Sequence, residues 1–221
     1  MMYGSQYVLY GATRACPRCA EIHPPREGIQ ETAISRFKLM QLMFELVYAN
    51  LHNPGTCRQE DRMFGILTTP LRVYAAHSGP TQNGTTSFLT AACKRGYKIC
   101  DERSASLPGR IDIRFNEIPA EEYEATYTRG GGYRPGACAA PRLIQQAILD
   151  YQHTGQHIDP TTWAMSEVMY KKNPTKSPAG DGQDWIHGLT AHSCETCARL
   201  VPLLLCTRDT DWSGAFNRIF G

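Results

Sequence analysis

The chain has 221 residues, a formal net charge of +2, 42% hydrophobic residues and 20% charged residues. Such a chain can bury one sizeable core, which excludes a disordered protein, and its small net charge does not by itself indicate nucleic-acid binding. No apolar stretch is long enough to span a bilayer, and residues 1–14 lack the basic start and apolar core of a secretory signal. We therefore expect neither a membrane segment nor a classical signal peptide.

Nine cysteines are many for a chain of this length, and their number is odd. Without a signal peptide, metal ligation is favoured over a disulfide framework. Some of these cysteines lie outside any metal-binding motif, and we expect them to be small buried hydrophobic side chains. They are Cys57, Cys93, Cys100 and Cys206.

The front of the chain is predicted to be mainly helical. Residues 29–51 are apolar and contain neither Gly nor Pro, which predicts a buried helix. Residues 63–76 are also apolar but fit either a strand or a helix, and residues 86–97 predict a short helix after two turn sequences. We therefore interpret residues 1–108 as a helical N-terminal extension or lobe.

The pattern changes at Gly109. Residues 110–115 alternate between apolar and polar, and residues 123–128 are rich in β-forming side chains, so both predict strands. Three further elements follow: a helix over 139–151, a buried strand over 161–170 and a helix over 194–206. Residues 109–221 are therefore expected to form an α/β core, with a mixed sheet flanked by helices.

Cysteines open both predicted helices of this core. Cys138 begins the first helix, and Cys194 and Cys197 begin the second in a Cys-x-x-Cys spacing. Helix N-termini favour the thiolate over the thiol, and a Cys-x-x-Cys turn lets two sulfurs reach one tetrahedral ion. A third thiolate leaves one coordination position free for water. The spacing therefore predicts a catalytic zinc at Cys138, Cys194 and Cys197.

The sequence Cys138-Ala139-Ala140-Pro141-Arg142, followed by Cys-x-x-Cys, resembles the cytidine deaminase-like superfamily. It is most similar to the bacterial toxin-type branches, whose first motif reads Cys-Ala-Glu-Pro-Lys/Arg. The resemblance covers about residues 109–206. It implies a three-layer α/β fold, a zinc cofactor on the three cysteines, and hydrolytic deamination of a nucleobase, with cytosine favoured over adenine.

The same resemblance implies a partner and a place of action. The substrate would be a nucleic acid or a nucleotide, and the protein would be a secreted effector delivered into the cytoplasm of a target cell. A cognate immunity protein would protect the producing cell. Tyr133, Trp163 and Trp185 are candidates for stacking on the base, although aromatic residues also fill cores. His192 and Ser193 precede Cys194 and are candidates for contacting the substrate, although His192 fits a solvated or capping position equally well.

Ala140 departs from the family motif. It stands where the general acid/base Glu is expected, and its methyl group cannot move protons between water, the ring nitrogen and the leaving ammonia. Loss of a general acid/base forfeits about 10²–10⁴-fold in rate, so this form should be nearly inert. Two origins are open: a deliberate Glu→Ala change that protects an expression host, or a natural protein that has lost the activity.

A second thiol pair supports a different class of function. Cys16-Pro17-Arg18-Cys19 could complete a four-thiolate zinc ribbon with Cys194 and Cys197, which would make the protein a non-enzymatic nucleic-acid or protein binding module. Alternatively, Cys16 and Cys19 form a separate structural zinc site or remain unligated. The candidate further ligands of a separate site are His23, His52 and Cys57. A thiol–disulfide oxidoreductase is a third option, but Cys194 comes late in the chain for that role.

Overall fold

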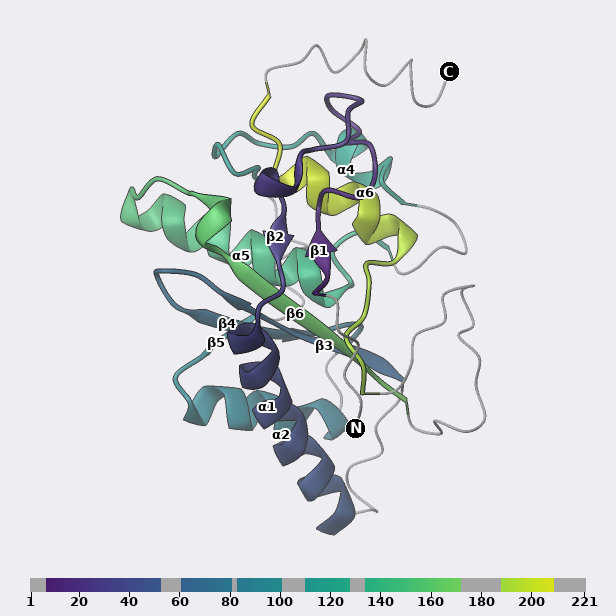
Figure 1. The fold of residues 1–221 in the computed structure, drawn as a ribbon, viewed down its shortest axis with the longest axis vertical. Coiled ribbons are helices and arrows are strands. Elements are labelled where there is room, and N and C mark those ends of the chain that lie inside the picture. Colours follow the sequence, from purple (N-terminus) through teal and green to yellow (C-terminus); the bar gives the residue numbers. More distant parts are fainter. Residues whose placement is uncertain are drawn as a thin grey trace.

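The computed structural model describes residues 7–52, 61–80, 83–100, 110–127, 134–171 and 188–208. In these residues a mixed sheet lies between two layers of helices (Figure 1). Helices α1 (Ala33–His52) and α2 (Asn83–Lys94) cover one face, and α5 (Ala139–Thr154) and α6 (Glu195–Leu204) cover the other. The predicted α/β class, a mixed sheet between helical layers, is confirmed.

The described sheet has six strands in the order β1-β2-β6-β3-β4-β5. Their bounds are β1 (Leu9–Tyr10), β2 (Ile29–Gln30), β3 (Arg62–Thr68), β4 (Val73–His77), β5 (Lys98–Cys100) and β6 (Ala164–Tyr170). Strand β6 runs parallel to β2 and antiparallel to β3. Strands β3 and β4 form an antiparallel hairpin, and β5 runs parallel to β4. The strand that leads toward Cys194 therefore lies in the middle of the sheet.

Alternation along the strands divides the core between the two faces, because successive strand side chains point to opposite sides. Phe64 and Ile66 of β3 pack with α1 and α2 in one buried cluster. Leu67 of β3 and Met165 of β6 belong to the other cluster, which includes the buried faces of α5 and α6. The cysteines that open α5 and α6, namely Cys138, Cys194 and Cys197, lie in this second cluster. The candidate metal site is therefore packed against the α5 face of the sheet.

Most of the predicted helices and the strand over 161–170 are confirmed with small shifts of their ends. The ambiguous segment 63–76 is the β3–β4 hairpin, whose turn is closed by Thr69 through its backbone and side-chain bonds to Arg72. Helix α1 is only half buried, contrary to prediction. Its apolar residues continue around the helix, and one face stays exposed: Ile34, Phe37, Phe44 and Tyr48.

The strands predicted over 110–115 and 123–128 are wrong in the described residues, which include 110–127. The carboxylate of Asp112 accepts hydrogen bonds from the backbone amides of Arg114 and Asn116, and Phe115 adopts a positive φ of 65°, so the chain turns instead of extending. Residues Ala120–Glu124 form the short helix α4, which begins after Pro119. A proline followed by acidic residues is a helix-start signal that outweighs the β-forming side chains downstream.

The expectation that the sheet comes from the back half of the chain is also wrong. Strands β1 to β5 all precede residue 101, and β6 is the only described strand after it. The predicted boundary at 108/109 itself lies outside the described residues. Because β6 pairs with β2 on one side and β3 on the other, both halves of the chain build one sheet.

Candidate metal site at Cys138, Cys194 and Cys197

Two helix N-termini present the three cysteines. Cys138 is the N-cap residue of α5, and Cys194 is the N-cap residue of α6; both have extended backbone angles. The Cys194 sulfur accepts a hydrogen bond from the Cys197 amide at 3.4 Å, which gives this helix start the partner that a Ser or Asp usually supplies. Pro141 occupies the first turn of α5, where its missing N–H costs nothing.

The structure brings these three thiols together, although Cys138 and Cys194 are 56 residues apart in sequence. Their sulfurs are 3.7 Å apart, and all three sulfurs lie within 4.8 Å of one another. Sulfurs bound tetrahedrally at about 2.3 Å from one ion lie roughly 3.8 Å apart, so the arrangement fits a shared metal ion. All three side chains are buried. Among the described residues, no fourth thiol, imidazole or carboxylate joins them.

The three thiols perturb one another strongly. Hydrogen bonds from the Cys138 and Cys197 thiols lower the pKa of Cys194 to about 3. The same contacts, together with burial, raise the pKa of Cys138 and of Cys197. One thiolate is thus stable here and three are not, because adjacent buried anions repel one another. A divalent cation removes that repulsion, so the group can hold a metal ion.

Tyr10 fixes the segment that leads into Cys194. Its hydroxyl, fully buried, donates to the Ala191 carbonyl at 3.2 Å and accepts from the Glu167 amide at 3.1 Å. The Ala191 amide in turn donates to the Glu167 carbonyl, so residues just before Cys194 pair with the middle of β6. Sequence reasoning missed Tyr10, since nothing near it in the chain indicates a partner 181 residues away.

Arg142 fixes the approach to Cys138. Its buried guanidinium donates to the carbonyls of Gly136, His77 and Gly79 at 3.1, 2.7 and 2.9 Å. These bonds tie the end of β4 to the turn that precedes α5. Arg142 follows Pro141 in the sequence motif, and the structure gives it a positioning role.

Glu167 is a second functional candidate that the sequence did not reveal. It lies in β6 with its side chain on the α5 face, and its carboxylate accepts a hydrogen bond from the Ala140 amide at 3.0 Å. Burial, followed by the negative charge of Cys194, raises the pKa of Glu167 to about 8. A buried carboxyl therefore lies beside the backbone of Ala140 at the start of α5.

Only some of the predicted substrate-contacting residues lie near the three thiols. His192 is exposed and Ser193 is half-buried, and both directly precede Cys194. Trp163 is buried and packs on Tyr151 near the C-terminal end of α5, whereas Cys138 lies at its N-terminal end. The structure therefore does not bring Trp163 to the three thiols. Tyr133 and Trp185 lie outside the described residues.

The second thiol pair belongs to a separate group. Cys16, Cys19, His23 and Cys206 place their ligand atoms within 4.8 Å of one another, and neither Cys194 nor Cys197 is among them. The shared zinc ribbon is therefore wrong, because the two groups lie at opposite ends of α6. Cys206 is buried as expected but has these partners, Cys93 is exposed, and the side chains of His52 and Cys57 lie outside the described residues.

Comparisons of the chain with protein-family models, with curated proteins and with solved structures found no match. In the described parts of the chain, no helix combines the length and apolar character needed to cross a membrane. The function must therefore be argued from the chemistry of the thiol groups and the residues around them.

Proposed function

We propose that the chain is a zinc-dependent nucleobase deaminase in a form that lacks its general acid/base residue. One observation carries the proposal: three buried thiols from two helix N-termini converge within 4.8 Å. Thiolate ligands favour zinc among the common divalent ions, and three of them leave a fourth tetrahedral position. The motif around Cys138 supports deamination as the reaction, with cytosine favoured over adenine.

In this proposal, each of the described residues near the site has a distinct role. Cys138, Cys194 and Cys197 bind the ion, which would act as a Lewis acid that activates water near neutral pH. Arg142 and Tyr10 hold the two segments that carry these cysteines. A Glu at position 140 would take the proton from water and deliver it to the ring nitrogen and the departing amine. Ala140 cannot do so, and we expect at least about a 10²-fold loss of rate.

Glu167 does not join the three thiols in the metal group, and its described contact is to the Ala140 amide. Its position supports a role in fixing the start of α5 rather than in ligating the ion. The proposal therefore expects that Glu167 cannot substitute for the missing Glu at position 140, a point that the activity of the present chain tests directly.

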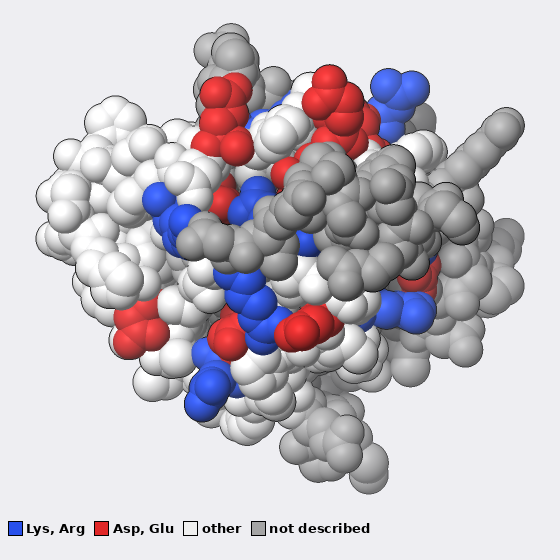
Figure 2. Space-filling model, turned by 90° about the horizontal axis from the view of Figure 1, so that it is seen from above, with Lys and Arg blue, Asp and Glu red and all other residues white. Residues whose placement is uncertain are grey.

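The charges on the one face shown in Figure 2 support a substrate that enters a local site rather than one that lies along a broad basic band. On the face shown in Figure 2, Lys and Arg side chains lie among Asp and Glu side chains. Arg110, a basic residue of the back half, lies over the Tyr123 ring, 4.2 Å from its centroid, and pairs with Glu124. A single extruded base or a nucleotide fits this distribution of charge better than a long duplex.

Delivery into a target cell and protection by an immunity protein complete the proposal. These two elements rest on the similarity of the Cys138 motif to toxin-type deaminases alone. They predict that a restored enzyme is harmful to the bacterium that expresses it.

The test is Ala140→Glu, expressed under tight repression and followed by sequencing of host DNA and RNA. We expect C-to-T changes in DNA or C-to-U changes in RNA; A-to-G changes would indicate adenine instead. Ala140→Gln is the matched control, because it has the same size but cannot transfer a proton. Cys138→Ser in the Ala140→Glu background should abolish the activity together with the zinc ion bound at Cys138, Cys194 and Cys197.

Purified protein makes the test independent of the host. Ala140→Glu should release ammonia from a single-stranded oligonucleotide or a cytidine nucleotide, whereas Ala140→Gln and the present chain should not. A folded Ala140→Glu protein that holds zinc but deaminates no DNA, RNA or nucleotide would overturn the deaminase proposal. If removal of Cys138 leaves the zinc content unchanged, while removal of Cys16 and Cys19 removes all of the zinc, the non-enzymatic module would be favoured.

A further inference from the structure

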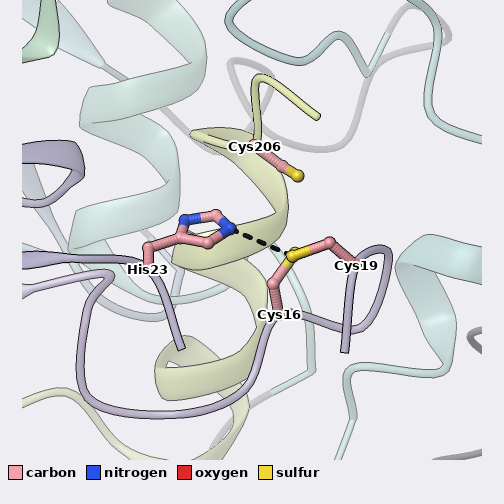
Figure 3. Close-up of side chains that lie close together, drawn as sticks. All are labelled: Cys16, Cys19, His23 and Cys206. Atoms are coloured by element: carbon pink, nitrogen blue, oxygen red, sulfur yellow. Dashed lines mark hydrogen bonds between the residues drawn. The ribbon is translucent and has the colours of Figure 1, made fainter. Parts of the chain in front are cut away.

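A second buried cluster joins the beginning and the end of the described chain. Cys16, Cys19 and His23 come from the loop after β1, and Cys206 follows the C-terminal end of α6. In Figure 3 the four side chains lie close together, and the dashed line joins the His23 ring to the Cys19 sulfur. All four residues are at most 8% exposed, and their ligand atoms lie within 4.8 Å of one another.

The donor set is complete for one tetrahedral ion. Three thiols and one imidazole nitrogen are a standard closed set for structural zinc. The His23 Nε2 atom is 3.5 Å from the Cys19 sulfur. A nitrogen and a sulfur bound tetrahedrally to one zinc lie about 3.5 Å apart, given bond lengths of about 2.0 and 2.3 Å. The three cysteines are free thiols, not disulfide partners.

The backbone from Cys16 to Glu21 is folded into the tight turn that such a site needs. The Ala20 amide donates to the Cys16 carbonyl at 2.8 Å, and the Cys16 amide donates to the Glu21 carbonyl at 2.9 Å. Ala20 has a φ of 58°, a left-handed conformation that costs a non-glycine residue about 1 kcal/mol or more. The turn places the sulfurs of Cys16 and Cys19 within 4.8 Å of each other, as shared binding of one ion requires.

One cationic side chain lies beside the cluster. Zinc with three thiolates and a neutral imidazole carries a net charge of −1. The Arg208 guanidinium lies 3.9 Å from the Cys19 sulfur and pairs with Glu21 and Glu27. An N–H group directed at a thiolate stabilises the ligand from outside the coordination shell.

We propose that Cys16, Cys19, His23 and Cys206 bind a structural zinc ion, distinct from the ion proposed at Cys138, Cys194 and Cys197. The closed donor set leaves no position for water, so its role is to fasten the N-terminal loop to the end of α6. Helix α6, about 15 Å long for its ten residues, then has a metal group at each end. The second ion holds this helix in place, and with it the two cysteines of its N-terminus.

Metal content of the purified full chain tests the proposal. We expect about two zinc ions per chain by elemental analysis and native mass spectrometry. Cys206→Ser and Cys194→Ser should each lower the content to about one, whereas Cys93→Ser, which removes an exposed thiol, should leave two. The two variants empty different sites. Loss of zinc in Cys206→Ser alone would support this site without the enzyme site, and loss in Cys194→Ser alone would support the enzyme site without this one.

Two further measurements keep the test decisive if Cys206→Ser fails to fold. His23→Cys replaces one ligand by another and should retain two zinc ions, whereas His23→Phe should retain about one. X-ray absorption of the wild-type chain should report imidazole nitrogen together with sulfur around zinc. A wild-type chain with no more than one zinc, unchanged in Cys206→Ser or His23→Phe, would overturn the proposal, as would a disulfide among Cys16, Cys19 and Cys206.

Discussion

The carboxylate of Glu167 in β6 and the backbone amide of Ala140 in α5 form a hydrogen bond of 3.0 Å across the interface between sheet and helix. Gly65 of the neighbouring strand makes room for it, because a Cβ there would lie 3.1 Å from the Glu167 side chain and from Leu143. The start of α5, and so Cys138, is held against the sheet by a buried acidic group.

This contact predicts an unusual dependence of stability on pH. The pKa of Glu167 is raised to about 8 in the folded chain, so between roughly pH 4.5 and 8 the folded state keeps a proton that the unfolded state has released. The contribution of Glu167 to stability should therefore fall as pH rises through this window, by at most about 5 kcal/mol. The lowered pKa of Cys194 contributes in the opposite direction, so the Glu167 effect is read from the difference between the chain and its Glu167→Gln variant. Glu167→Gln, which keeps the shape without the charge, should flatten the fall.

Urea denaturation at intervals between pH 5 and 8 measures this effect. A bound cation at the three thiols would oppose the shift, so the fall should be steeper in chelator-treated protein than in metal-loaded protein. Parallel curves for wild type and Glu167→Gln in both states would show that this carboxyl does not carry the effect.

Replacement of Arg142 should destabilise the fold near the metal site. Arg142→Ala leaves the carbonyls of His77, Gly79 and Gly136 without their buried donor, and we expect a loss of about 3–5 kcal/mol in the free energy of unfolding. Arg142→Lys should recover only part of it, since an ammonium cannot reach all three acceptors with the same geometry. Denaturation curves give the first quantity, and zinc retained after dialysis against a weak chelator should fall in the same order.

Arg18 is the centre of a buried charge network that links the Cys16 loop to α4. Its guanidinium pairs with Asp112 at 2.5 Å and with Glu122 at 3.0 Å, and both carboxylates are at most 2% exposed. Arg18→Ala would leave two buried anions without their partner, so we expect a loss of about 3–5 kcal/mol. Burial already raises the pKa of Glu122, and the arginine opposes that rise, so the variant should recover stability as the pH falls toward 5.

The matched control for this prediction is Arg14→Ala. Arg14 pairs with Glu195 at 2.8 Å, but both side chains are substantially exposed, at 57% and 36%. A solvent-exposed pair contributes less than about 1 kcal/mol, so the control should change stability little. Equal losses in the two variants, measured by urea denaturation at pH 7, would contradict the assignment of a buried network.

Local pattern was enough to predict α1, α2, α5, α6 and the strand over 161–170, because each is an apolar-rich stretch bounded by turn or helix-end signals. It failed for residues 110–128, where the Asp112 side chain captures backbone amides and Pro119 starts a helix. The alternation that resembled a strand was therefore outweighed by hydrogen bonding that no periodicity reveals.

Some residues of the candidate site could likewise be predicted from local sequence, and others could not. The helix-start cysteines could be predicted from spacing, since Cys138, Cys194 and Cys197 each sit at a recognisable N-terminus. Tyr10, Glu167 and Cys206 could not, because their partners come from distant segments through the sheet order. A short two-residue strand such as β1 gives no sequence pattern strong enough to predict that pairing.

The central place of β6 has a practical consequence for anyone who divides this protein. A fragment that begins at residue 109 would retain all three cysteines of the deaminase-like motif, yet it would keep only one of the six described strands. Its β6 would have two bare edges, prone to pairing with other copies. Truncation to the recognisable motif should therefore produce aggregates rather than a minimal enzyme.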